Sequence, residues 1–310
     1  MRQLSDKFLN DLKIGLLSPM LKRIKDDNTL MLAIRENYVN IYYRGGNIMK
    51  IEATNTDNTY KAFFDTQYNK TARSLPDMPP VLSTATDVTS WIAALPNLKE
   101  TMDFFLSVHN KPEREFQQLV ARENNFSPIS NETEYFLSDI EFADSDIGAR
   151  FDMLAIRWQA SARKDGSNCR PALIEMKYGD NALSGKAGII EHLDDFKKFI
   201  ENKEKYGFLL DTMSNQFSQL DELDLLNFNR SKGITEVIFG KNTTPEIIFL
   251  LANHNPRSTK LRKIINDPKL DKYGQSALFD LRFFVASFAG YGFHSKCMLS
   301  LKEFRSLLNT

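Results

Sequence analysis

The spacing of apolar residues predicts a small α+β unit at the amino terminus. Apolar residues from Phe8 to Leu17 recur at helical spacing behind Ser5, which is a favourable helix N-cap. Residues 29–54 then alternate between apolar and polar positions on both sides of Gly45-Gly46, a composition typical of hairpin turns. We therefore expect a helix followed by a β-hairpin.

A proline-rich segment, residues 74–87, breaks this pattern, and we place the domain boundary just after it, between units 1–97 and 98–310. From residue 113 the patterns predict the order helix, three strands, helix, strand, helix. This order is typical of an α/β fold with a mixed sheet flanked by helices. The predicted strands are 133–143, 149–160, 170–179 and 246–253, and the predicted helices are 113–124, 188–207 (ended by Gly207) and 259–267.

Composition narrows the class of protein. The chain has 310 residues, of which 42% are hydrophobic, enough for a substantial core. No apolar run reaches the roughly 18 residues of a membrane span, and the amino terminus does not resemble a secretory signal, so we expect a cytoplasmic protein without membrane contact. The 40 basic and 40 acidic residues balance, so binding to nucleic acid would require a local basic patch. The two cysteines form no CxxC pair, which argues against a cysteine-rich zinc site.

Candidate chemistry lies in the predicted strand 170–179. Side chains alternate along a strand, so Glu175 and Lys177 share one face while Ile174 and Met176 share the other. The preceding predicted strand carries Asp152 within apolar sequence. These elements would bring an ammonium group and two carboxylates together.

A third carboxylate is expected from the predicted helix 113–124. At about 100° per residue, Glu113 lies nearer than Glu115 to the centre of the apolar stripe, so we choose Glu113 as the inward acid. Carboxylates that share a cavity repel one another, and a divalent cation removes this conflict. Mg²⁺ or Mn²⁺, bound by Asp152, Glu175 and Glu113, would activate water, which Lys177 would position or deprotonate.

These residues resemble the PD-(D/E)XK nuclease superfamily, whose core runs helix, three-stranded meander, helix, strand. The matching residues are Glu113 in "EREFQ", Asp152 in "RFDML", and Glu175 with Lys177 in "IEMK"; the "ERE" start resembles that of archaeal Holliday-junction resolvases. The resemblance covers residues 105–260 and implies a restriction-endonuclease-like fold. It also implies magnesium-dependent hydrolysis of phosphodiester bonds in nucleic acid, with DNA as the expected substrate.

The sequence departs from the superfamily pattern at two places. Phe151 occupies the position before Asp152, where proline is common, and residues 153–174 make a long separation between Asp152 and Glu175. A hairpin extension would absorb the additional residues. Phe151 changes the first residue of the motif but leaves its charged residues, which carry the chemistry, in place.

Several further residues have two interpretations. Residues Arg257, Lys260, Arg262 and Lys263 are either a nucleic-acid contact or a solvated helix face. Lys186 lies in a glycine-containing segment without the spacing of a phosphate-binding loop, and it is a candidate phosphate contact. His192 is either part of the site or a surface residue of its helix.

Two other functions are compatible with the same sequence. The first keeps the nuclease fold but loses activity, which leaves a nucleic-acid-binding or protein-interaction module. The second is an interaction scaffold whose amino-terminal hairpin contacts a protein partner. In the scaffold interpretation, Glu175 and Lys177 would form a solvent-exposed ion pair far from Asp152.

Overall fold

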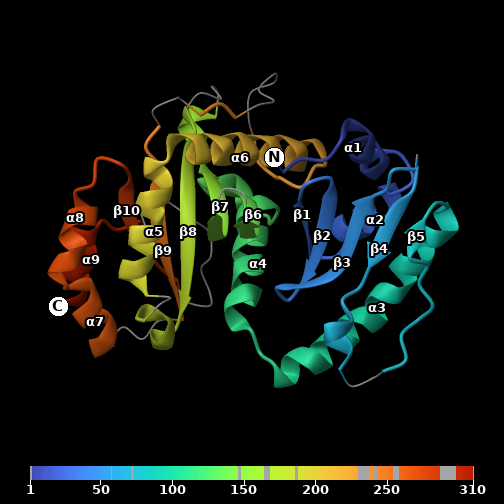
Figure 1. Cartoon of the computed structure of the whole chain (residues 1–310), viewed down its shortest axis with the longest axis horizontal. Coiled ribbons are helices and arrows are strands. Elements are labelled where there is room, and N and C mark those ends of the chain that lie inside the picture. The colour runs from blue at the N-terminus through green and yellow to red at the C-terminus, as the bar shows by residue number, and fades with distance from the viewer. Residues whose placement is uncertain are drawn as a thin grey trace. The chain divides into compact units, whose positions relative to one another are not determined.

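The computed structural model divides the chain into two compact units, Met1–Gln118 with Gln219–Leu225, and Leu119–Ser218 with Leu226–Thr310 (Figure 1). It describes residues 2–56, 58–70, 73–145, 148–163, 168–185, 188–229, 237–239, 243–253, 258–286 and 298–309. The division falls within helix α4 (Pro112–Asn125), whereas the predicted boundary after residue 97 falls inside helix α3 (Ala85–Val108). The two differ because the proline-rich segment contains β5 (Val81–Leu82) and runs into α3, and both belong to the first unit.

The first unit contains an antiparallel sheet with the strands in sequence order (Figure 1). Its strands are β1 (Leu30–Ile34), β2 (Tyr38–Tyr43), β3 (Gly46–Ala53), β4 (Tyr60–Phe63) and β5 (Val81–Leu82). The predicted hairpin joins β2 to β3, and its turn lies one residue earlier than expected, at Arg44 and Gly45. Both turn residues have positive φ, 50° and 72°, the geometry of a two-residue hairpin loop with matching twist.

Short helices complete the first unit. Helix α1 (Asp6–Lys13) begins at the predicted cap, where the Ser5 hydroxyl accepts the Phe8 N–H, and α2 (Ser18–Lys25) follows. The helical spacing predicted through Leu17 is therefore divided between two helices, and Leu17 caps the second. Helix α3 packs against β3, β5 and the 3-10 helix η1 (Thr66–Asn69).

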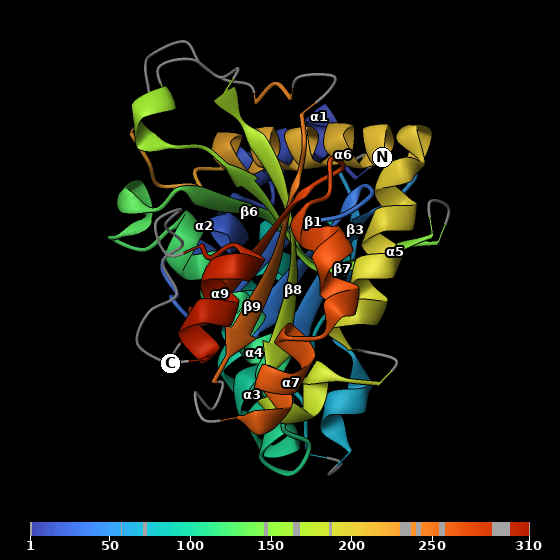
Figure 2. The same cartoon turned by 90° about the vertical axis from the view of Figure 1, so that its left-hand side faces the viewer.

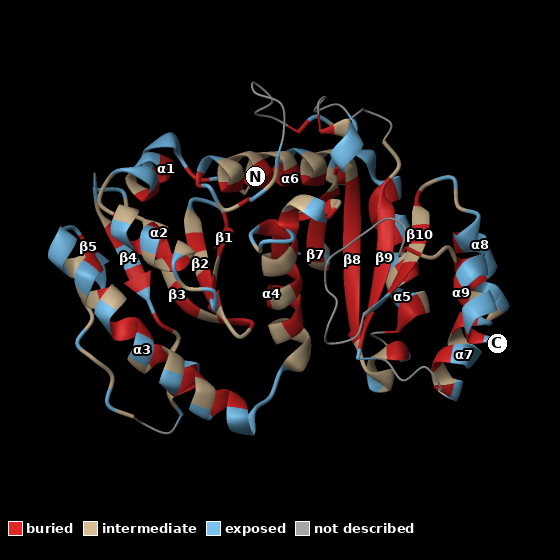
Figure 3. Ribbon diagram, turned by 180° about the vertical axis from the view of Figure 1, so that it is seen from behind, coloured by how far each residue is buried: buried red, intermediate tan, exposed pale blue. Residues whose placement is uncertain are grey.

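The second unit is built around a mixed sheet in the order β10-β9-β8-β7-β6. The strands are β6 (Tyr135–Asp144), β7 (Ala149–Arg157), β8 (Arg170–Tyr178), β9 (Glu246–Ala252) and β10 (Asp280–Ala286). Strands β6, β7 and β8 pair antiparallel, as the meander prediction requires, and β8, β9 and β10 pair parallel. Figure 3 shows β8 and β9 buried over most of their length, and all seven residues of β9 are buried.

Helices flank this sheet, and in Figure 2 strands β8 and β9 run between α5 and α9. The helices are α5 (Ile189–Glu201), α6 (Lys203–Glu222), α7 (Thr259–Ile265), α8 (Asp271–Gly274) and α9 (Leu301–Leu308). The 3-10 helices are η2 (Ser130–Glu132), η3 (Ala160–Ala162), η5 (Asp180–Leu183) and η6 (Pro268–Leu270). The predicted mixed α/β architecture is thus confirmed.

The predicted end of one helix at Gly207 is wrong. Helix α5 ends at Glu201, Asn202 is extended, and Gly207 lies inside α6. Glycine disfavours a helix interior by only about 1 kcal/mol, so burial of α6 residues such as Leu209 and Met213 overrides that preference. Within the described ranges, no helix combines the length and apolar character needed to cross a membrane.

Candidate active site

Glu175 and Lys177 form a buried ion pair on β8. Lys177 Nζ lies 2.7 Å from Glu175 Oε1. Only 5% of Glu175 and 3% of Lys177 are exposed, so the prediction of a solvent-exposed pair, on which the scaffold interpretation depended, is wrong. A charged pair is costly to bury, and its place in the central strand of the sheet requires compensating contacts.

Asp152 lies on β7 just beyond the point at which its pairing with β8 ends. The last paired residues on this side are Met153 and Ile174, so Asp152 is the next residue opposite Glu175. In place of main-chain pairing, Asp152 Oδ2 accepts the Met176 N–H at 2.8 Å. The sequence-predicted residues Asp152, Glu175 and Lys177 are therefore brought together.

Burial raises the pKa of Asp152, and the Met176 N–H and the charge of Lys177 oppose that rise. The charge of Glu141 adds to it. Glu141 lies on β6 opposite Asp152, because Ile140 pairs with Met153 and Phe142 with Phe151. Its φ of 50° is uncommon for a residue other than glycine. This neighbouring acid was not predicted, since it is one of several acids in an otherwise ordinary strand sequence.

His192 contributes a second nitrogen to Glu175. From the second turn of α5, its Nε2 lies 3.0 Å from Glu175 Oε1. Burial, and then the charge of Lys177, lower the pKa of His192 to about 4, so the ring is neutral at pH 7. The structure thus favours the interpretation in which His192 belongs to the site.

Glu113 lies in the first turn of α4, within the first unit, and is partly buried. Its neighbour Glu115 makes hydrogen bonds with Arg44, including one of 2.8 Å from Arg44 Nε. Glu115 is therefore engaged in the first unit. The placement of Glu113 beside Asp152 stays a prediction.

The carboxylate oxygens of Asp152 and Glu175 suit a hard cation that needs few protein ligands. In the described parts of the chain, no group of three or more His, Cys, Asp or Glu residues is placed to hold a metal ion. Mg²⁺ commonly takes only one or two carboxylates and completes its shell with water and substrate phosphate. Asp152 and Glu175, on adjacent strands, fit that smaller requirement.

The predicted basic cluster is described only in part. Lys260, Arg262 and Lys263 lie on α7, and the last two are exposed. Helix α7 packs against η5, the segment that follows β8. Arg257 and Lys186 lie outside the described residues.

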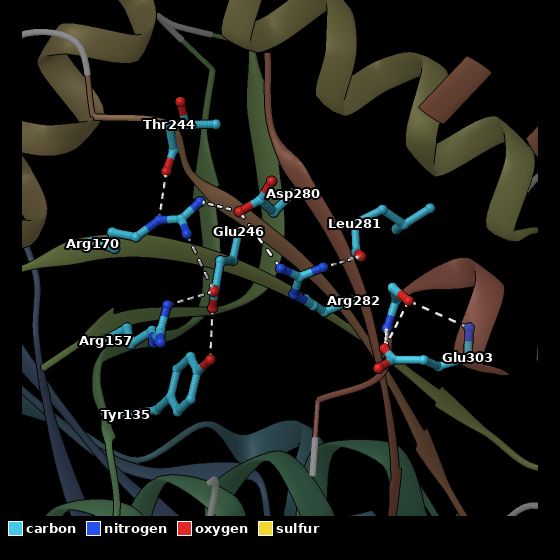
Figure 4. A network of polar contacts seen from close by, with 10 residues as sticks. Tyr135, Arg157, Arg170, Thr244, Glu246, Asp280, Leu281, Arg282 and Glu303 are labelled. Atoms are coloured by element: carbon cyan, nitrogen blue, oxygen red, sulfur yellow. Dashed lines mark hydrogen bonds and ion pairs between the residues drawn. The ribbon is translucent and has the colours of Figure 1, made fainter. Parts of the chain in front are cut away.

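A second polar cluster surrounds Glu246 (Figure 4), the first residue of β9, which pairs with Ala172 near the start of β8. Glu246 is 2% exposed, and its carboxylate accepts the Tyr135 hydroxyl at 2.6 Å and Arg157 Nη1 at 3.0 Å. Arg170 Nη1 approaches it at 3.6 Å and connects it to Asp280, whose Oδ2 lies 2.7 Å from Arg170 Nη2. Each strand of the sheet contributes one of these residues. The sequence prediction missed this cluster because every member is a single polar residue at the end of its strand.

Comparison with known proteins adds no relative: no family model matches the chain, and no match is found among curated proteins or solved structures.

Proposed function

We propose that the second unit is a metal-dependent nuclease with a restriction-endonuclease-like fold, and that it hydrolyses phosphodiester bonds, with DNA as its substrate. The observation that carries the proposal is the meeting of Asp152, Glu175 and Lys177 around the Met176 peptide. Asp152 accepts the Met176 N–H at 2.8 Å, and Lys177 pairs with Glu175 at 2.7 Å. An antiparallel meander followed by a parallel strand supports the fold assignment.

Asp152 and Glu175 would hold Mg²⁺ or Mn²⁺. The ion would supply Lewis acidity and lower the pKa of a bound water. Lys177 carries three N–H donors on a flexible stem, so its ammonium can remain near Glu175 while it orients the attacking water. Burial of both side chains excludes competing solvent and strengthens these interactions.

The described surface also supports a polyanionic substrate. Exposed Arg262 and Lys263 lie on α7, which packs against the segment following β8. Because the whole chain has no net charge, such a local patch would supply the phosphate contacts.

The direct test is cleavage of supercoiled plasmid DNA by the full chain, with Mg²⁺ and with a chelator. We expect cleavage only with Mg²⁺, and a loss of about 100-fold or more in Asp152→Asn and Lys177→Ala, typical of removing a general acid–base or charge-stabilising group. Lys197→Ala is the matched control, because Lys197 is exposed and its charged group contacts Glu201. Equal cleavage by all four proteins would refute the assignment.

The alternative of an inactive nuclease-fold module is distinguished by calorimetric titration with Mn²⁺. An active site of the proposed kind binds the ion and loses binding in Asp152→Asn. A folded wild-type protein that neither binds Mn²⁺ nor cuts DNA or RNA would support the binding module instead.

A further inference from the structure

The sheet of the first unit has one buried face and one face that is exposed toward β4 and β5. The register places Val39 of β2 opposite Ile51 of β3, and Ile51 opposite Ala62 of β4. These side chains share the buried face, and Val39 and Ile51 have no exposed surface. Helix α1 packs on this face, because the centroid of the Phe8 ring lies 4.7 Å from that of Tyr60, two positions before Ala62. The intervening side chains of these strands point to the other face.

On the other face, exposed apolar side chains lie directly opposite lysines. Phe63 of β4 pairs with Lys50 of β3, and Val81 of β5 pairs with Lys61 of β4. Phe63 is 54% exposed and Val81 is 42% exposed, and Lys61 is exposed as well. The Cβ atoms of directly opposite residues are about 5 Å apart, so each apolar side chain has a lysine beside it. We call these four residues the open face.

The lysines of the open face are available to an anion. Lys50 Nζ lies 3.0 Å from Glu52 Oε2 and 4.1 Å from the centre of the Tyr38 ring. The side chains of Lys50 and Glu52 are 30% and 45% exposed, and such an exposed ion pair contributes at most about 1 kcal/mol. A phosphate can therefore compete for Lys50. Together, Lys50, Lys61 and Glu52 leave one positive charge in excess.

This combination of an exposed ring and lysines fits single-stranded nucleic acid. An exposed aromatic side chain stacks on a base of any kind, while neighbouring cations contact the phosphate backbone. The bases of a duplex are stacked inside the helix, where the Phe63 ring does not reach them. An apolar protein partner would bury Lys50 and Lys61 without supplying an anion, which costs free energy.

We propose that the open face of the first unit binds single-stranded nucleic acid, with one base stacked on Phe63 and the adjacent phosphates contacted by Lys50 and Lys61. The first unit thereby gains a function of its own, which does not use the metal site of the second unit. This binding goes beyond the proposed nuclease activity and requires no metal ion.

The test measures binding of the full chain to a short fluorescein-labelled oligothymidylate by fluorescence anisotropy, with a chelator present so that metal-dependent cleavage cannot occur. We expect Phe63→Ala to bind about 10-fold more weakly than wild type, a typical effect of losing one base–aromatic stack. Phe126→Ala is the matched control and should bind as wild type does, because Phe126 is 39% exposed and belongs to the second unit. Lys61→Ala should reduce the slope of log affinity against log salt by about 0.7, the effect of one phosphate contact.

Phe63→Trp keeps an aromatic ring and reports stacking directly. The natural residues Trp91 and Trp158 are buried, so quenching of exposed tryptophan emission by the oligonucleotide comes from position 63. We expect such quenching, with an affinity close to that of wild type. An oligouridylate of the same length tests RNA against DNA, and any binding of duplex DNA should be equal in wild type and Phe63→Ala.

Equal affinity of wild type and Phe63→Ala for both single strands would overturn the proposal, and so would the absence of binding by wild type. If Phe63→Ala instead abolishes a dimer seen by sedimentation equilibrium and leaves single-strand binding unchanged, the open face is a contact between copies of the chain. Asp152→Asn should keep single-strand binding. Retained binding by a wild-type protein that cleaves no plasmid would therefore refute the nuclease proposal alone.

Discussion

Removal of the Glu246 carboxylate should destabilise the second unit strongly. Glu246→Ala removes the carboxylate that accepts the hydroxyl of fully buried Tyr135 and that Arg157 and Arg170 share. Breaking a buried ion pair from one side costs about 3–5 kcal/mol. Because the arginine side chains are 20% and 26% exposed and Arg170 keeps Asp280, both can recover some solvation. We therefore expect a loss of about 3 kcal/mol in the free energy of unfolding.

The two tryptophans allow the units to be followed separately. Trp158 is fully buried in the second unit, and Trp91 is buried in the first. In a Trp91→Phe background, fluorescence during urea unfolding reports the second unit alone. The background protein, Glu246→Ala and the control Glu201→Ala are compared, and the control should change by less than about 1 kcal/mol because its ion pair with Lys197 is exposed.

Tyr135→Phe provides an independent measure of the same contact. It should lower the free energy of unfolding by about 1.5–3 kcal/mol, the loss of one hydrogen bond to a charged group. The double variant of Tyr135→Phe and Glu246→Ala should lose less stability than the sum of the two single losses, because each substitution removes the same 2.6 Å hydrogen bond. A Glu246→Ala loss no larger than that of Glu201→Ala, or full additivity, would refute the assigned energetics.

Three further predictions concern Asp27, Gly45 and Gly207. Burial alone would raise the pKa of Asp27, but hydrogen bonds from Lys99 and Thr29 outweigh it and lower the pKa to about 2. This carboxylate therefore contributes about 2 kcal/mol to the free energy of unfolding above pH 4, and that contribution is lost as the pH falls toward 2. In acid titrations followed by Trp91 fluorescence, Asp27→Asn should lose less stability between pH 4 and pH 2 than wild type does. An equal loss in both proteins would contradict the assignment. Gly45→Ala should lower the free energy of unfolding by about 2 kcal/mol or more in the same assay at neutral pH, because the φ of Gly45 is 72° and an added Cβ would lie 2.3 Å from the Arg114 backbone. An unchanged free energy of unfolding would exclude that turn geometry. Gly207→Ala should stabilise the second unit by about 0.5–1 kcal/mol, measured by Trp158 fluorescence, because Gly207 lies inside α6 and, among the described residues, no atom beyond the adjoining helix backbone comes within 4 Å of an added Cβ. Destabilisation would contradict this.

Local patterns predicted strands β6 to β9 and helices α4, α5 and α7, and they indicated which residues carry the candidate chemistry. Alternation along β8 placed Glu175 and Lys177 on one face, and the continuous apolar run of β9 indicated a strand covered on both sides. The meander brought Asp152 to Glu175 because antiparallel neighbours in sequence pair in space.

Other features depend on distances that no local pattern contains. The α5–α6 break at Asn202 and the helical Gly207 follow from packing, which outweighs single-residue preference.

Sequence patterns alone were enough to predict the succession of elements from residue 113 to 267 and the residue types that carry the candidate chemistry, because side-chain periodicity and short connections are local properties. The burial of Glu175 and Lys177, the contact of His192 with Glu175 and the meeting of Tyr135 with Glu246 across the sheet became visible only in the folded arrangement. Burial and contacts between distant residues depend on how helices and non-adjacent strands pack. No single position of the sequence specifies that packing, because it depends on many residues that are distant along the chain.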